Sequence, residues 1–292
     1  MKSIIALLLL LLLYSNSKAN LTDSYRKDSV DNSTVAKTVP WFVERFRLTG
    51  GFFVPVSNTN IQVGIKGGSA GTDIDFEKDL GFNRTQATFL GNFQWRISPR
   101  SRFGFNYYNI PRNSTHQLDK EIDFNGQIYP VDATVKSFFN TAIYQISYGY
   151  AIVSKPKFEM GLMIGTHLVG GNIGISLAAE NLSESASTDF GFTAPLPDLG
   201  LWGGYAFSKK LAVNLDLTYL SLSVGGISGS IFAYNLLFVY KVIDKLDLSL
   251  GYSGLNFKVD YTKNDTNAKF DWSYNGPSLG VTYSFGKKSW IH

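Results

Sequence analysis

Cysteine is absent from this 292-residue chain, and charged residues make up only 17% of it. The lack of cysteine excludes disulfide bonds, cysteine-ligated metal sites and a lipid-modified N-terminal cysteine. The charged fraction lies below the ~25% that is usual for soluble domains. The formal net charge of +4 is too small to indicate nucleic-acid binding. Beyond residue 14 no apolar run approaches the ~20 residues that a transmembrane helix needs.

The N-terminus has the three parts of a secretory signal peptide. A basic start at Lys2 precedes an apolar run over residues 4–14, and small residues stand at Ser17 and Ala19. The run is too short to span a bilayer as a helix. We therefore expect residues 1–19 to be the signal peptide. Residues 20–40 are polar and unpatterned, which predicts a flexible tail.

Strand periodicity fills the rest of the chain. Aromatic residues make up 15% of the sequence and there are 28 glycines, a composition that fits either a secreted β-sandwich or an outer-membrane β-barrel. Rows of large apolar residues alternate with Gln, Asn, Asp, Arg, Ser, Thr and Gly in 87–97, 158–168, 211–219, 232–240 and 246–252. This pattern favours a closed wall with lipid outside and a polar lumen inside, because only a closed sheet pairs every backbone group in lipid.

Short polar turns set the strand count. They lie at 98–101, 154–157, 208–210 and 243–245, with loops expected at 67–83, near 125–126, and at 179–188, 223–229 and 263–265. The predicted fold class is all-β, an antiparallel transmembrane β-barrel of ten strands over residues 41–286, with eight or twelve strands as alternatives. Residues 287–292 are predicted to be a C-terminal extension. The alternation slips at Asn58 and Gly254, which we interpret as β-bulges.

The last predicted strand carries Gly280, Tyr283 and Phe285. A glycine followed by two alternating aromatics resembles the C-terminal assembly signal of Gram-negative outer-membrane β-barrel proteins. The resemblance covers the chain from about Trp41 onward, although those proteins usually end at the last aromatic, whereas residues 286–292 follow here. It implies an outer-membrane location and recognition by the barrel-assembly machinery.

The implied surroundings are outer-membrane lipid and lipopolysaccharide, and we expect a monomer that binds no nucleic acid. In this setting residues 20–40 would be a periplasmic tail, or alternatively a short plug in the lumen.

Two motifs are expected to carry no chemistry. Residues 276–280 match G-x-S-x-G around Ser278, but a nucleophile elbow needs a strand, a sharp turn and a helix, and here the alternation continues to Phe285. Residues 73–79 hold four carboxylates, yet Lys78 and Arg84 occupy the positions where an EF-hand loop needs Gly and Glu. We predict a hairpin with its charges in water, and no metal or cofactor.

His167 is the strongest catalytic candidate. Alternation directs it into the lumen, roughly 30 Å above the turn at Lys155 and near the outer leaflet edge. Counting across the 179–188 loop pairs it with Gly200 and puts Asp198 diagonally beside it. This placement resembles that of catalytic groups in outer-membrane proteases and lipid A deacylases. The alternative is a structural pair among other lumen charges, namely Arg96, Glu159, Asp216 and Asp247.

Ten strands also limit transport, because open aqueous pores need about sixteen. The predicted function is that of an integral outer-membrane β-barrel without enzymatic activity, with a structural role, surface binding or narrow passage. The alternative is an outer-leaflet enzyme that acts on lipid A or surface peptides through His167 and Asp198.

Overall fold

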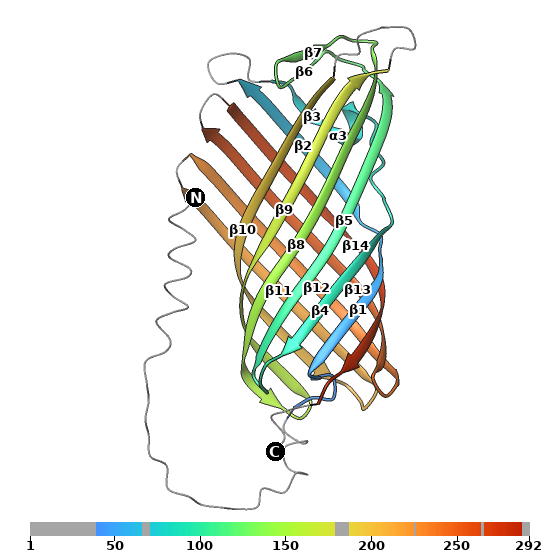
Figure 1. The fold of residues 1–292 in the computed structure, drawn as a ribbon, viewed down its shortest axis with the longest axis vertical. Coiled ribbons are helices and arrows are strands. Elements are labelled where there is room, and N and C mark those ends of the chain that lie inside the picture. The colour runs from blue at the N-terminus through green and yellow to red at the C-terminus, as the bar shows by residue number, and fades with distance from the viewer. Residues whose placement is uncertain (1–38, 66–70, 179–186, 225, 264–265, 288–292) are drawn as a thin grey trace, which may run out of the picture. The chain divides into compact units, whose positions relative to one another are not determined.

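The computed structural model describes residues 39–65, 71–178, 187–224, 226–263 and 266–287 (Figure 1). The predicted signal peptide, the tail up to residue 38 and the C-terminal extension past Lys287 lie outside these residues. Within them, no helix is long and apolar enough to cross a membrane.

The described chain is almost entirely β-strand, with one short helix, α3 (Phe76–Asp79). The strands are β1 (Phe46–Phe53), β2 (Val56–Ile65), β3 (Asp73–Asp75), β4 (Thr88–Arg96), β5 (Ser101–Gln117), β6 (Ile122–Phe124), β7 (Gln127–Tyr129), β8 (Thr134–Lys155), β9 (Phe158–Leu177), β10 (Ser187–Ala206), β11 (Leu211–Val224), β12 (Ile227–Ile243), β13 (Leu246–Lys263) and β14 (Thr266–Phe285).

The main sheet closes on itself through β14. Both β1 and β2 pair with β14, in successive stretches of its length. Pro55 separates β1 from β2 because proline has no N–H to donate to the ladder. With β1 and β2 counted as one wall strand and the short β3 as a flank of β2, the described wall has ten strands in the order β1/β2, β4, β5 and then β8 to β14. The predicted ten-stranded antiparallel barrel is confirmed.

The four predicted turns all occur, between β4 and β5, β8 and β9, β10 and β11, and β12 and β13. These four short turns lie together at one end of the barrel, which we call the turn end. The longer connections lie at the opposite end, the loop end (Figure 1). The loop predicted near 125–126 is a small hairpin of β6 and β7, turned by Asn125 and Gly126 with φ of 53° and 82°. Glycine and asparagine tolerate such angles.

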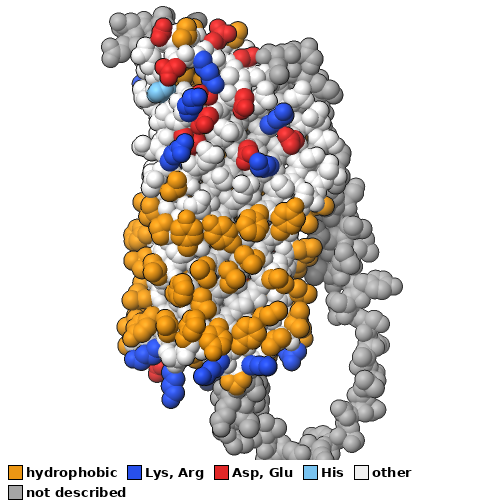
Figure 2. All heavy atoms as spheres, turned by 180° about the vertical axis from the view of Figure 1, so that it is seen from behind, with side chains coloured by type: hydrophobic (Ala, Val, Ile, Leu, Met, Phe, Trp, Pro, Cys, Tyr) orange, Lys and Arg blue, Asp and Glu red, His pale blue; other side chains and the backbone are white. Residues whose placement is uncertain are grey.

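An apolar belt covers the half of the barrel near the turn end, called the turn half, and Figure 2 shows one face of it. The side chains point outward and are more than a third exposed. The belt consists of Leu48, Phe52, Phe89, Tyr144, Ile146, Tyr148, Tyr150, Ile152, Met160, Leu162, Ile164, Leu199, Leu201, Tyr205, Leu211, Leu215, Tyr219, Phe232, Phe238, Tyr240, Leu248, Leu250, Tyr252, Leu279, Val281, Tyr283 and Phe285.

The hydrophobic pattern inverts in the other half, the loop half. Along β13, Leu248, Leu250 and Tyr252 face outward, whereas Leu255 and Phe257 further along the same strand are 2% and 0% exposed. Charged and polar residues cover the outer wall there (Figure 2). A strand needs ~9–11 residues to cross a bilayer, and β8 has 22. The wall is therefore about twice as long as a bilayer crossing requires.

The predicted β-bulges at Asn58 and Gly254 are wrong. The pairing of β2 with β14 runs through Asn58 without a shift, and so does the pairing of β13 with both neighbours through Gly254. The slip in the apolar pattern comes from the inversion between the two halves, because the side that is apolar changes while the backbone alternation continues. The shifts that do occur lie at Ala151/Val153 and Lys241/Ile243, next to the turns.

An apolar core fills the loop half. Its members are buried side chains from the wall, from α3 and its flanks, and from the β6–β7 hairpin. They include Phe53, Ile61, Val63, Ile74, Phe76, Leu80, Phe82, Ile110, Phe124, Tyr129, Phe139, Ile143, Val169, Ile173, Ile231, Leu255, Phe257, Phe270, Trp272 and Tyr274. Each fully buried large apolar side chain stabilises the fold by about 1.5–3 kcal/mol, so this core is a major source of stability.

Candidate functional site

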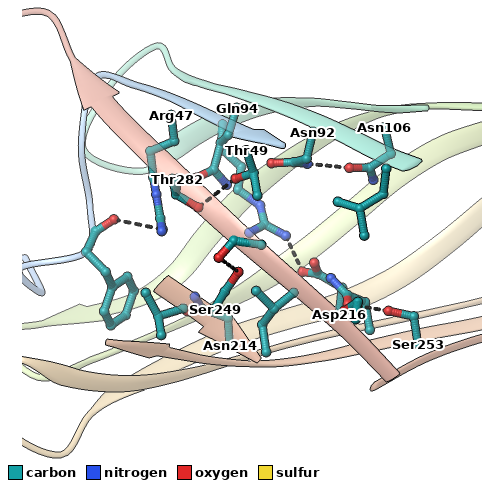
Figure 3. Close-up of a pocket in the computed structure, with 18 of the residues that line it drawn as sticks. Arg47, Thr49, Asn92, Gln94, Asn106, Asn214, Asp216, Ser249, Ser253 and Thr282 are labelled. Atoms are coloured by element: carbon teal, nitrogen blue, oxygen red, sulfur yellow. Dashed lines mark hydrogen bonds and ion pairs between the residues drawn. The ribbon is translucent and has the colours of Figure 1, made fainter. Parts of the chain in front are cut away.

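The inner surface of the turn half is the candidate site, because it gathers polar side chains around a cavity of about 110 Å³. Figure 3 shows these side chains converging from several strands of the wall. The lining includes Arg47 and Thr49 of β1, Asn92, Gln94 and Arg96 of β4, Arg102 and Asn106 of β5, Glu159 of β9, Asn214 and Asp216 of β11, Ser249 and Ser253 of β13, and Ser278 and Thr282 of β14. The space admits a few water molecules or a small ion.

Three ion pairs cross this lumen. Arg96 Nη2 lies 2.6 Å from Glu159 Oε1, with side chains 2% and 3% exposed. Arg47 contacts Asp247 at 3.3 Å, and Arg102 contacts Asp216 at 2.5 Å. All four of the lumen charges named from the sequence are members of these pairs. Their partners Arg47 and Arg102 were not predicted, although each stands on the polar side of an alternating strand.

Neutral side chains complete the network. Asn92 and Asn106 hydrogen-bond to one another, and Asn106 donates to Gln145 Oε1 at 2.5 Å. Thr49 and Thr282 share a hydrogen bond of 2.8 Å. A network joined in this way holds the side chains in fixed positions, so the turn-half lumen is largely filled.

Residues 39–43 close the turn end, and we call this segment the cork. Phe42 and Val43 are buried, at 3% and 1% exposure, against Ala206 and Ala212 of the wall. Trp41 Nε1 donates to the carbonyl of Ser208 at 2.9 Å, and Arg47 donates to the carbonyl of Phe42 at 3.3 Å. Because Phe42 also lines the cavity, the cork separates the polar lumen from the space beyond the turns.

The acidic segment 73–79 folds inward, so the predicted hairpin with all its charges in water is wrong. Glu77 Oε1 lies 2.6 Å from Arg112 Nη1, and both side chains are 2% exposed. Glu77 also accepts from the backbone N–H of Thr59 at 2.9 Å. Burial lowers the pKa of the Arg112 guanidinium, an effect that Glu77 opposes through its hydrogen bond and its charge. The carboxylate thus joins β2, α3 and β5 where β4 does not extend.

Metal ligation has no support among the described residues. No group of three or more His, Asp or Glu side chains in the described ranges could hold an ion. The carboxylates of 73–79 instead form hydrogen bonds and ion pairs with nearby protein groups. Asp75 caps α3 by accepting from the N–H groups of Glu77 and Lys78, and Asp79 pairs with Lys120 at 2.7 Å.

The structure brings His167 and Asp198 together. His167 Nδ1 lies 2.6 Å from Asp198 Oδ2, and the two side chains are 4% and 0% exposed. Leu196 stands opposite His167, and Gly165 opposite Asp198, so the predicted pairing of His167 with Gly200 is wrong by four residues, whereas the diagonal relation to Asp198 is present. Neither residue lines a described cavity.

The C-terminal motifs lie on a continuous strand. β14 runs from Thr266 to Phe285, so Ser278 stands in a strand rather than at a strand-to-helix turn. Tyr283 and Phe285 belong to the apolar belt, at 52% and 37% exposure. Gly280 faces inward, where an added Cβ would lie 2.9 Å from Ser249 Oγ and 3.1 Å from Thr49 Cγ2. Close packing therefore explains this glycine, whereas its role in assembly stays a prediction.

No protein-family model and no curated protein sequence matches the chain. Solved structures do match. The outer-membrane protease OmpT of Escherichia coli is 11% identical, with a TM-score of 0.53 over 82% of this chain and 97% of its own. The outer-membrane protein OprG of Pseudomonas aeruginosa (10% identity, TM-score 0.35, 83% and 97% covered) and the toluene transporter TodX of Pseudomonas putida (9%, 0.35, 88% and 93%) are more distant.

At such low identity these likenesses concern the fold alone. Together with the closed antiparallel wall, the match to OmpT shows that this chain has the fold of an antiparallel β-barrel.

Proposed function

We propose that this protein is a sealed, non-enzymatic barrel of the outer membrane that carries a solid, water-exposed wall beyond the lipid surface. The observation that supports this proposal is the inversion of the hydrophobic pattern halfway along the strands. Lipid around the belt and water around the loop half account for both patterns with one continuous sheet. The loop half then serves as a rigid support for binding at the cell surface.

The termini give the orientation. Outer-membrane barrels have short turns on the periplasmic side and longer loops outside. β1 begins and β14 ends at the turn end, where Phe46 pairs with Phe285. We therefore assign the turn end to the periplasm and the loop half to the outside. The expected surroundings are outer-leaflet lipid and lipopolysaccharide, and the chain is expected to act as a monomer.

Passage through the barrel is opposed at three levels. The cork closes the turn end, the polar network fills the turn-half lumen, and the apolar core occupies the loop half. A solute would have to displace side chains at each level. Structural support or surface binding therefore suits this geometry better than narrow passage does.

Conductance tests this proposal. We expect purified protein in a planar lipid bilayer to give no single-channel currents above those of the protein-free bilayer. Deleting the cork alone should leave the barrel closed, because the apolar core still fills the loop half. Stable, regularly sized currents from the intact protein would contradict the proposal and would favour narrow passage.

The close contact of His167 with Asp198 keeps an enzymatic alternative testable. His167→Asn and Asp198→Asn each remove a group that general acid–base catalysis would need. We expect both variants to keep the lipid A of their host cells and a set of surface peptides unchanged from wild type, as measured by mass spectrometry. Loss of a wild-type modification in both variants, with heat-dependent gel migration retained, would overturn the non-enzymatic proposal.

A further inference from the structure

Exposed cations lie at the turn end, below the apolar belt, on the face that Figure 2 shows. Each of the four short turns carries at least one exposed Lys or Arg, and another follows β14. We call this set the basic collar, which consists of Arg100, Lys155, Lys157, Lys209, Lys210, Lys245 and Lys287.

None of the collar side chains takes part in an ion pair with a described residue, and Asp244, beside Lys245, is the exposed carboxylate within the four short turns. Some cations of the loop half do have acidic partners. Lys258 pairs with Asp271 at 2.6 Å and Lys120 with Asp79 at 2.7 Å. The collar charge is therefore available to an anionic partner outside the chain.

The level of the collar indicates the kind of partner. The belt residues Tyr150, Tyr205 and Tyr240 stand near the turn ends of β8, β10 and β12, within a few residues of collar lysines in the sequence. Aromatic side chains mark the boundary between lipid and water, and long lysine side chains extend from such a boundary to the lipid headgroups. In a membrane that surrounds the belt, the collar lies in the plane of the phosphates.

The distribution of the collar favours a lipid leaflet over a soluble polymer. Its cations come from connections that are spread around the circumference. A polymer strand would meet one side of this ring, whereas a leaflet meets all sides at once. We propose that the basic collar binds the headgroups of anionic phospholipids in the leaflet at the turn end. This inference rests on the membrane position given under the proposed function.

The test uses nanodiscs of phosphatidylcholine mixed with a minor share of phosphatidylglycerol. Native mass spectrometry then measures which lipid stays bound to the released protein. We expect wild type to retain phosphatidylglycerol preferentially. The double variant Lys155→Gln/Lys209→Gln should lower that preference by roughly fivefold or more, given the usual attraction between a membrane-surface cation and anionic lipid. The preference should also weaken as salt is raised.

A matched control variant distinguishes an effect of the collar position from an effect of the protein's net charge. Lys136→Gln/Lys269→Gln removes two exposed cations from the outer wall of the loop half and should leave the lipid preference unchanged. Equal retention of phosphatidylglycerol by wild type and the collar variant, or an equal loss in the control, would overturn the inference. Collar-dependent binding of a soluble anionic glycan without any lipid preference would do the same.

Two further readouts keep the outcomes distinct. Heat-dependent gel migration should show that the collar variant folds, because its substituted side chains have no ion pairs to lose. Conductance in the same lipid mixture reports on the sealed barrel separately. A conducting wild type that still prefers phosphatidylglycerol would contradict the proposed function and leave the collar inference standing.

Discussion

Replacing Glu159 with leucine is expected to destabilise the folded barrel by about 3–5 kcal/mol. The substitution leaves Arg96 charged and only 2% exposed on its side chain, without its partner. Removing one member of a buried ion pair costs this much because the remaining charge stays out of water. The measurement is the free energy of unfolding in lipid vesicles, followed by tryptophan fluorescence during denaturant titration.

Two companion variants separate charge burial from loss of contact. Arg96→Met/Glu159→Leu removes both charges and should cost clearly less than Glu159→Leu alone. Asp271→Asn breaks the pair with Lys258, which also measures 2.6 Å but has side chains 58% and 43% exposed, and it should cost at most about 1 kcal/mol. If Glu159→Leu and Asp271→Asn lowered the free energy of unfolding by similar amounts, the Arg96–Glu159 pair would be exposed to water, contrary to a filled lumen.

Replacing Phe139 with alanine should cost about 3–5 kcal/mol. Phe139 is fully buried in the loop-half core. Its ring lies 5.5 Å from that of Phe76, 5.8 Å from Phe270 and 5.9 Å from Trp272, all at steep angles. Alanine would leave a cavity at the centre of this aromatic cluster. Hydrogen exchange should show faster opening of α3 and the loop-half strands, with the turn half still protected.

The neighbouring residue provides the control. Phe138 stands on the opposite, outer side of β8 and is partly exposed. Phe138→Ala removes the same side chain from a surface position and should cost clearly less than Phe139→Ala. Equal costs, or unchanged exchange in the loop half of the Phe139 variant, would argue that the loop half has no tightly packed core.

The number of wall strands and the positions of the four short turns could be predicted from the sequence. Turns such as Ser154–Lys157 are short and polar, and they stand between long apolar alternations, so their positions depend on local chemistry alone. The lumen charges were also predictable from local sequence. Each alternates with large apolar residues along its strand, so it must point to the opposite, inner side of the wall. Glu159 and Asp247 are two examples, and both face inward in ion pairs.

The register between β9 and β10 was predicted incorrectly because it depends on the length of a loop. Polar composition suggested a loop at 179–188, whereas the ladder extends to Ser176 opposite Ser187. The pairing of the two strands is therefore shifted by four residues from the predicted one, and His167 lies opposite Leu196. Asp198 is still diagonal to it, because either register keeps these two residues on the inner face and within reach.

The loop-half core was not predicted, because the sequence interpretation assumed that lipid surrounds the strands over their whole length. Leu255 and Phe257 follow Leu250 and Tyr252 with opposite parity, and this change was read as a bulge. The same change of parity in several strands at a common height indicates a change of the outer medium. The inward fold of 73–79 depends on Glu77 meeting Arg112, a long-range contact that no local pattern contains.

The central claim is that one continuous wall, closed in the turn half, faces lipid there and faces water in the loop half around a solid core. Cysteine labelling can test this claim. The chain has no cysteine, so single variants give a clean signal. On β9, Ile164 and Asn172 face outward in the two halves, and Ile173 faces the core. In vesicles, a membrane-impermeant maleimide should label Asn172→Cys rapidly and leave Ile164→Cys and Ile173→Cys unlabelled until the protein is unfolded. Rapid labelling of folded Ile173→Cys, or protection of Asn172→Cys, would contradict the account.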